Sequence, residues 1–105
     1  MGSYLHHAIV VTAPTEELLT PAFSKAMECG LMEMMTPILR APLNGIASFF
    51  IGPDGSKEGW LESDSGEMRR ALFLDALAGM EGIRWALVSY GDDHGLPAQV
   101  ERSDR

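Results

Sequence analysis

The sequence has almost no cysteine, and this limits the kinds of site that it can build. Cys29 is the only cysteine among the 105 residues. A single thiol excludes an internal disulfide framework and a zinc site made of several cysteines. It is also typical of a reducing compartment, so we expect a cytoplasmic protein.

Basic residues and long apolar runs are scarce as well. Lys and Arg number 8 against 15 Asp and Glu, which gives a formal net charge of -7. A protein that coats duplex nucleic acid needs a basic face, so this balance argues against a duplex partner. No apolar run approaches the roughly 20 residues of a membrane-spanning helix, and the first residues lack the basic and apolar regions of a signal peptide. The sequence therefore predicts no duplex nucleic acid and no membrane among its partners.

The apolar residues that are present suffice for one core. Hydrophobic residues make up 46% of the chain and charged residues 22%. A chain of this length buries roughly two-thirds of its unfolded surface, which is enough for a single domain. We expect that domain over residues 4–93, followed by a polar, flexible C-terminal tail over 94–105.

The order of predicted elements is strand, helix, strand, strand, helix, strand. β-branched and aromatic runs indicate the strands, and apolar residues at helical spacing behind a capping residue indicate the helices. The predicted strands cover 4–12, 47–51, 59–63 and 83–90, and the predicted helices begin near Thr15 and at Asp64 or Ser65. A reverse turn at 53–56 makes 47–51 and 59–63 a hairpin.

This order favours an α+β fold of the ferredoxin-like split βαβ type. Right-handed crossovers then give a four-stranded antiparallel sheet in the spatial order 4-1-3-2, with both helices on one face. Residues 31–46 are hard to assign, because Pro37 and Pro42 forbid a continuous helix. The pattern leaves open an extra edge strand near 38–41, and Asn44-Gly45 is a tight-turn signal.

In such a fold one face of the sheet is open to water, yet these strands are apolar on both sides. Ile9 points to one face while Ala8 and Val10 point to the other, and in 47–51 Phe50 opposes its apolar neighbours. A large exposed apolar patch is unusual on a soluble monomer. We therefore expect a homodimer that buries the open face against a second copy, with cover by the C-terminal tail as the alternative.

Polar side chains begin the first strand and follow the last, and an antiparallel pairing brings these two ends together. Histidines and carboxylates in such a cluster could hold a divalent metal or place a base beside an acid. However, the spacing matches no known ligand motif, and adjacent histidines on a strand point to opposite faces, which favours a packing role. We expect no metal and no cofactor, and the candidate ligand-binding residues are His6, His7, Tyr90, Asp92, Asp93 and His94.

Trp60 is a further candidate, in the predicted strand 59–63. A tryptophan flanked by Glu58 and Glu62 suits an anchor in a protein interface, because the carboxylates would repel the phosphates of a nucleotide. Lys57 is one of the few basic positions near this hairpin and belongs to the same candidate binding surface. No serine has histidine and aspartate partners at a suggestive spacing, so the sequence leans away from an enzyme.

Three segments of the sequence resemble a group of small hypothetical proteins of bacteriophages and prophages. They are 6–12 (HHAIVVT), 42–64 (PLNGIASFFIGPDGSKEGWLESD) and 90–93 (YGDD), and the most specific part is GPDGSKEGW with SFF before it. Pro21 departs from the group, whose first helix is uninterrupted. The resemblance implies a phage context, and hence the cytoplasm of a bacterial host, but no particular activity.

The sequence leaves two functions open. The first is a homodimeric binding protein that engages or inhibits a host or phage protein through Trp60 and its acidic surface, by analogy with small acidic phage proteins. The second is a small-ligand or nucleotide-binding protein. Its pocket would lie between protomers, or at the edge where the first strand begins and the last strand ends. The lack of a catalytic motif favours the first.

Overall fold

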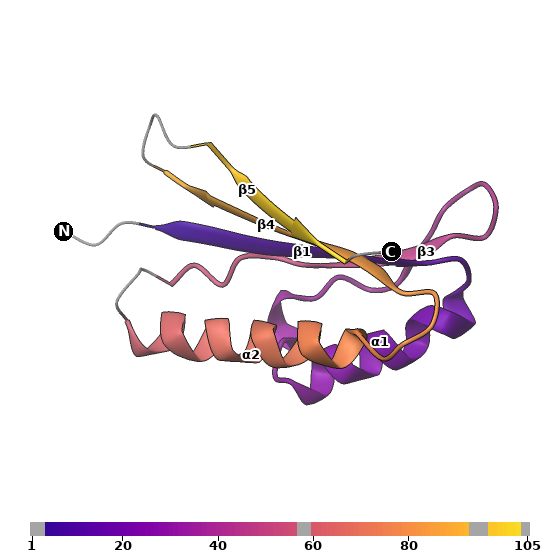
Figure 1. The fold of residues 1–105 in the computed structure, drawn as a ribbon, viewed down its shortest axis with the longest axis horizontal. Coiled ribbons are helices and arrows are strands. Elements are labelled where there is room, and N and C mark those ends of the chain that lie inside the picture. The colour runs from indigo at the N-terminus through magenta and orange to yellow at the C-terminus, as the bar shows by residue number, and fades with distance from the viewer. Residues whose placement is uncertain (1–3, 57–59, 93–96, 104–105) are drawn as a thin grey trace.

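The computed structural model of the protein describes residues 4–56, 60–92 and 97–103. In this part of the chain, five strands form one sheet and two α-helices pack against one of its faces (Figure 1). The elements are β1 (Leu5–Ala13), α1 (Glu16–Glu28), the short 3-10 helix η1 (Met32–Met34), β2 (Leu39–Arg40), β3 (Ala47–Ile51), α2 (Leu61–Leu77), β4 (Arg84–Gly91) and β5 (Gln99–Arg102). The predicted α+β class is confirmed. Within the described ranges, no helix is long and apolar enough to cross a membrane.

The strands lie in the order β2-β3-β1-β4-β5, and every neighbouring pair is antiparallel. The predicted count of four strands is therefore wrong. Residues 61–63 begin α2 instead of forming a strand, and Gly59 lies outside the described residues. Glu62 and Asp64 in the first turn favour a helix, because carboxylates interact well with the positive end of the helix dipole.

The hairpin predicted between 47–51 and 59–63 is also wrong, since β3 pairs with β1 on one side and with β2 on the other. The chain turns between β2 and β3 at Asn44 and Gly45, whose φ angles are 63° and 69°. Asn and Gly are the residues that adopt this left-handed conformation most readily. The edge strand left open near 38–41 corresponds to β2.

At the other edge, β5 pairs with β4 in a segment for which the sequence predicts a tail. The register places Val100 opposite Val88 and Gln99 opposite Ser89. All four residues of β5 are exposed. Hydrogen bonds to the backbone of β4 therefore stabilise β5 more than apolar burial does. The sequence of β5 has no alternation of apolar and polar residues from which a strand could be predicted.

The core lies between the helices and one face of the sheet. Ile9 and Val11 of β1 and Phe49 of β3 are fully buried there. The Phe49 ring meets Phe23 of α1 edge-on, with ring centroids 5.2 Å apart, and lies 6.4 Å from the ring of Phe73 of α2. One strand residue thus packs against both helices. Because side chains alternate along a strand, the even-numbered residues of β1 and β3 point to the opposite face. Figure 1 shows both helices on the other side from that face, which we call the open face.

Candidate functional site

The α2 helix carries large apolar side chains on the side away from the core. Phe73 and Leu77 are buried, whereas Leu61, Met68 and Leu72 are 83%, 66% and 58% exposed. Residues seven and four positions apart lie on the same side of a helix. The three exposed residues therefore line up along α2, and we call them the α2 ridge.

Trp60 lies next to the N-terminal end of the ridge. It is the residue that precedes α2, and 48% of it is exposed. The structure thus places the predicted anchor at a helix start instead of in a strand. Trp60 lines a hollow of about 480 Å³ together with Leu61, Asp54 and Arg70. Lys57, the other candidate from this segment, lies outside the described residues.

Carboxylates border the α2 ridge. Glu62, Asp64, Glu67 and Asp75 are all exposed on the helix, together with the single exposed cation Arg69. The outer surface of α2 is therefore an apolar stripe on a helix that exposes four carboxylates and one cation. An apolar groove with a basic rim is the complementary surface.

Asp54 connects the segment before α2 to the helix. Its Oδ1 accepts hydrogen bonds from the N–H and the hydroxyl of Ser56, at 2.9 and 2.6 Å, and its Oδ2 lies 3.9 Å from Nη1 of the buried Arg70. A Cβ at Gly66 would lie 2.6 Å from Oδ2, so the glycine leaves room for this carboxylate. Burial raises the pKa of Asp54, but the hydrogen bonds from Ser56 and the charges of Arg70 and His7 together lower that pKa below its usual value.

Three of the predicted site residues meet where β1 begins and β4 ends. His6 and Tyr90 face each other in the β1–β4 register with ring centroids 5.1 Å apart. Nε2 of His6 lies 2.8 Å from Oδ1 of Asp92. Tyr4 stacks on His6, with ring centroids 6.1 Å apart and nearly parallel planes. We call these four residues the aromatic end of the sheet.

His7 points to the opposite face and does not belong to the aromatic end. Its Nδ1 lies 2.9 Å from Oγ of Ser89, its partner in the β1–β4 register. The predicted pairing of the two strands brings His7 near the end of β4, but its exact partner depends on the register, over 82 positions of sequence. A base beside a hydroxyl is one part of a nucleophilic site, which also needs donors for an oxyanion. The remaining candidates, Asp93 and His94, lie outside the described residues.

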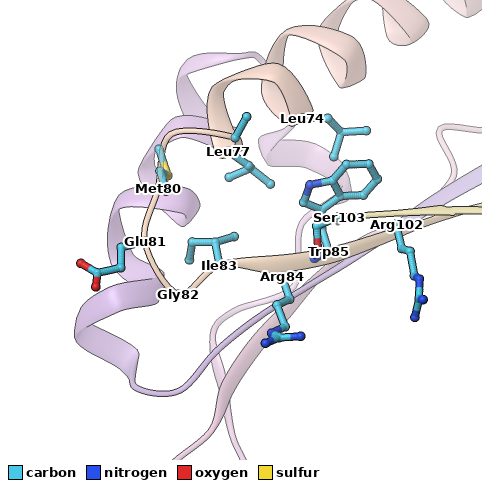
Figure 2. A pocket seen from close by; sticks show the side chains of 11 residues that line it. Leu74, Leu77, Met80, Glu81, Gly82, Ile83, Arg84, Trp85, Arg102 and Ser103 are labelled. Carbon is cyan, nitrogen blue, oxygen red and sulfur yellow. Dashed lines mark hydrogen bonds between the residues drawn. The ribbon is translucent and has the colours of Figure 1, made fainter. Parts of the chain in front are cut away.

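A trough runs between α2 and β4 on the covered side of the sheet. Two hollows of about 530 and 490 Å³ share Leu74 and Trp85 in their linings. Figure 2 shows the indole of Trp85 directed toward Leu74, while the side chains of Arg84 and Arg102 point the other way. Trp85 thus belongs to the covered side, and the two arginines belong to the open face.

The geometry gives no metal centre in the part of the chain that the structure describes. No three His, Cys, Asp or Glu side chains lie there in an arrangement that could hold a metal ion. His6 and His7 point to opposite faces, so the two imidazoles cannot share one ion.

Comparisons of the chain with protein-family models, with curated proteins and with solved structures give no match. The resemblance to phage and prophage proteins therefore stays a prediction.

Proposed function

We propose that the protein is a binding protein, not an enzyme, and that it docks the α2 ridge into an apolar groove of a protein partner. The observation that carries the proposal is the exposure of Leu61, Met68 and Leu72 on the side of α2 opposite the buried Phe73. A helix that packs on a sheet normally turns polar residues to water. An apolar stripe on the outer side adds nothing to the core and is typical of an interaction surface.

The partner's chemistry follows from the border of the ridge. Carboxylates at Glu62, Asp64 and Asp75 surround the apolar stripe, and the whole chain has a net charge of -7. A partner groove with Lys or Arg on its rim would be attracted over a distance and oriented before contact. Insertion of an amphipathic helix face into such a groove is a recurring mode of recognition, with anchors spaced as they are here.

The size of the ridge suits a specific contact. Full burial of a Leu or Met side chain contributes roughly 1.5–3 kcal/mol, so the three ridge residues give on the order of 6 kcal/mol before the costs of association. Trp60, half-exposed at the end of the ridge, enlarges the surface. Tryptophan is one of the residue types most often found at energetic centres of interfaces.

The rest of the fold acts as a rigid support for α2. The four strands β4-β1-β3-β2 follow the order 4-1-3-2, which supports a ferredoxin-like arrangement with β5 added at one edge. In the phage context that the sequence resemblance implies, the partner would be a host or phage protein, and binding would occupy or inhibit it.

The test compares two triple variants in affinity capture from the source cell and then with the purified captured protein. The ridge variant carries Leu61→Gln, Met68→Gln and Leu72→Gln. The control carries Met32→Gln, Leu43→Gln and Ile46→Gln, which replace apolar residues that are 64%, 72% and 43% exposed elsewhere. We expect the ridge variant to bind at least about tenfold more weakly than the wild type, and the control to bind equally well.

Salt provides a second readout on the same purified pair. Because carboxylates border the ridge, the association rate should fall as salt concentration rises, and the dissociation rate should change little. A captured protein that binds both triple variants alike, or the absence of any protein that distinguishes them, would contradict the proposal.

A further inference from the structure

The open face of the sheet has two chemically different ends. At the start of β1 lies the aromatic end, where the carboxylate of Asp92 is paired with His6 beside the ring of Tyr90. Tyr90 is 45% exposed, so its ring is available for contact on this face. This end is bulky and carries an acidic group.

The other end is hollow and basic. Val10, Thr12 and Ala86 are short side chains on neighbouring strands, and Thr12 lies opposite Arg84 while Ala86 lies opposite Arg102 in the registers. These five residues line a hollow of about 350 Å³ on the open face, which we call the arginine hollow. Figure 2 shows both arginines directed away from α2.

Between these ends the face is apolar. Ala8 lies opposite Val88, and Val88 lies opposite Val100, which is 61% exposed. Short apolar side chains at the centre of the face let two sheets approach to the ~10 Å separation of packed β-layers. The larger ring of Phe50, opposite Val10 and 44% exposed, lies on the same face toward the β3 side.

We propose that a second copy of the chain covers the open face, with the aromatic end of each copy seated in the arginine hollow of the other. A twofold axis between the faces, perpendicular to β1 and close to Ala8 and Val88, exchanges the two ends of the sheet. The carboxylate of Asp92 then meets the guanidinium groups of Arg84 and Arg102 at two equivalent places, as an isologous interface requires. This inference uses the side of the molecule opposite the α2 ridge and is independent of the proposed function.

The charge pairing can form only between copies. Asp92 lies six positions along β4 from Ala86, the register partner of Arg102, which is about 20 Å at the usual rise per residue of a strand. The two charged ends of one face are therefore too far apart to pair within a chain. If the β1 strands of the two copies ran in the same direction, the arginines of one copy would lie against the arginines of the other. The charges therefore favour the arrangement in which the two β1 strands run in opposite directions.

The area of the face also fits a second copy. The strands β3, β1, β4 and β5 at ~4.8 Å spacing, and ~27 Å of length along β4, give roughly 500 Å² per copy. Two copies would bury about 1,000 Å², at the lower limit of specific interfaces, so we expect a dimer that dissociates in the micromolar range.

The test is sedimentation equilibrium of the full chain between about 1 and 100 µM, the range over which an interface of this size should dissociate. We expect the mass to rise from the 11.4 kDa of one chain to twice that value. Arg102→Glu and Asp92→Arg should each weaken the homodimer at least about tenfold, since each change replaces an attraction by a repulsion in both contacts. Glu101→Arg, on the neighbouring residue that points to the other face, should leave it unchanged.

Mixing the two single variants tests the arrangement itself. In an Arg102→Glu chain paired with an Asp92→Arg chain, one contact keeps the wild-type groups, and the other regains an attraction between the two substituted positions beside the unchanged Arg84. The mixture should therefore dimerise more tightly than either variant alone. A mass of one chain over the whole range would overturn the inference, and so would a dimer that these variants do not affect. Weakened homodimers that mixing fails to rescue would overturn it as well.

Discussion

Gly66 of α2 faces Asp54 so closely that a Cβ at position 66 would lie 2.6 Å from the carboxylate oxygen Oδ2. Ser56 and Arg70 hold this carboxylate in place, so it cannot move away without losing contacts. A glycine in the middle of a helix therefore serves the contact between α2 and the segment before it, although it weakens the helix itself.

We predict that Gly66→Ala lowers the melting temperature. Alanine favours a helix over glycine by about 1 kcal/mol. However, the new methyl group displaces the Asp54 carboxylate, which leaves the charge of the buried Arg70 incompletely paired and destabilises the fold. Gly79→Ala, just beyond the end of α2, is the control for the same substitution without a close contact, because a Cβ at Gly79 meets nothing within 4 Å. Thermal denaturation followed by circular dichroism measures both. A Gly66→Ala protein as stable as the control would show that the contact contributes nothing.

We predict that the stability of the protein falls in acid because of Asp54. Its pKa is lowered in the folded state by Ser56, Arg70 and His7, which outweigh the effect of burial. A carboxyl group with a lowered pKa stabilises the fold fully above its unfolded pKa of about 4, and this contribution is lost as the pH falls through the folded pKa.

Ser56→Ala tests this assignment. The substitution removes the hydroxyl that donates to Oδ1, so the pKa of Asp54 should rise toward its ordinary value and the melting temperature should depend less on pH below about pH 4. Titration of the Asp54 carboxyl carbon by NMR gives the pKa directly. An unchanged titration midpoint in the variant would refute the role given to Ser56.

We predict that the Leu61→Gln, Met68→Gln and Leu72→Gln variant melts at the same temperature as the wild type or higher. The three side chains are 83%, 66% and 58% exposed, and glutamine forms helices nearly as well as leucine and methionine. If the melting temperature of the variant fell by several degrees, the ridge would stabilise the fold, and its exposure would no longer indicate a binding surface.

The elements with a strong pattern could be predicted from the sequence, and the short ones could not. The β-branched run in β1 indicates its strand well, and the apolar residues of α2 indicate a helix without showing which of its sides is buried. In contrast, the pair Trp60-Leu61 is too short to show a period, and the acidic first turn decides in favour of a helix. Strand β5 has one apolar residue, Val100, and depends on backbone pairing that composition does not reveal.

The aromatic end of the sheet can be predicted from the sequence, because it depends only on which strands pair and in which direction. Antiparallel pairing of the first and last predicted strands places His6 near Tyr90 and Asp92, and the structure brings the three together. The contact between His7 and Ser89 follows from the same register. To predict it, the exact alignment of the two strands must be known, and the two residues are 82 positions apart in the sequence.

Of the α2 ridge, only Leu61 is missed because the sequence predicts a strand there. Met68 and Leu72 lie in the predicted helix, whose apolar residues occur on both sides, so the pattern does not indicate that these two are exposed.

The proposed function depends most on direct contact between the α2 ridge and the partner, and site-specific photo-crosslinking measures that contact. A photoreactive amino acid is placed at position 68 in one protein and at position 43 in another, where Leu43 is similarly exposed away from the ridge. After irradiation with the purified partner, we predict a covalent adduct from position 68 and none from position 43. Adducts of equal yield from both positions, or an adduct from position 43 alone, would contradict the account.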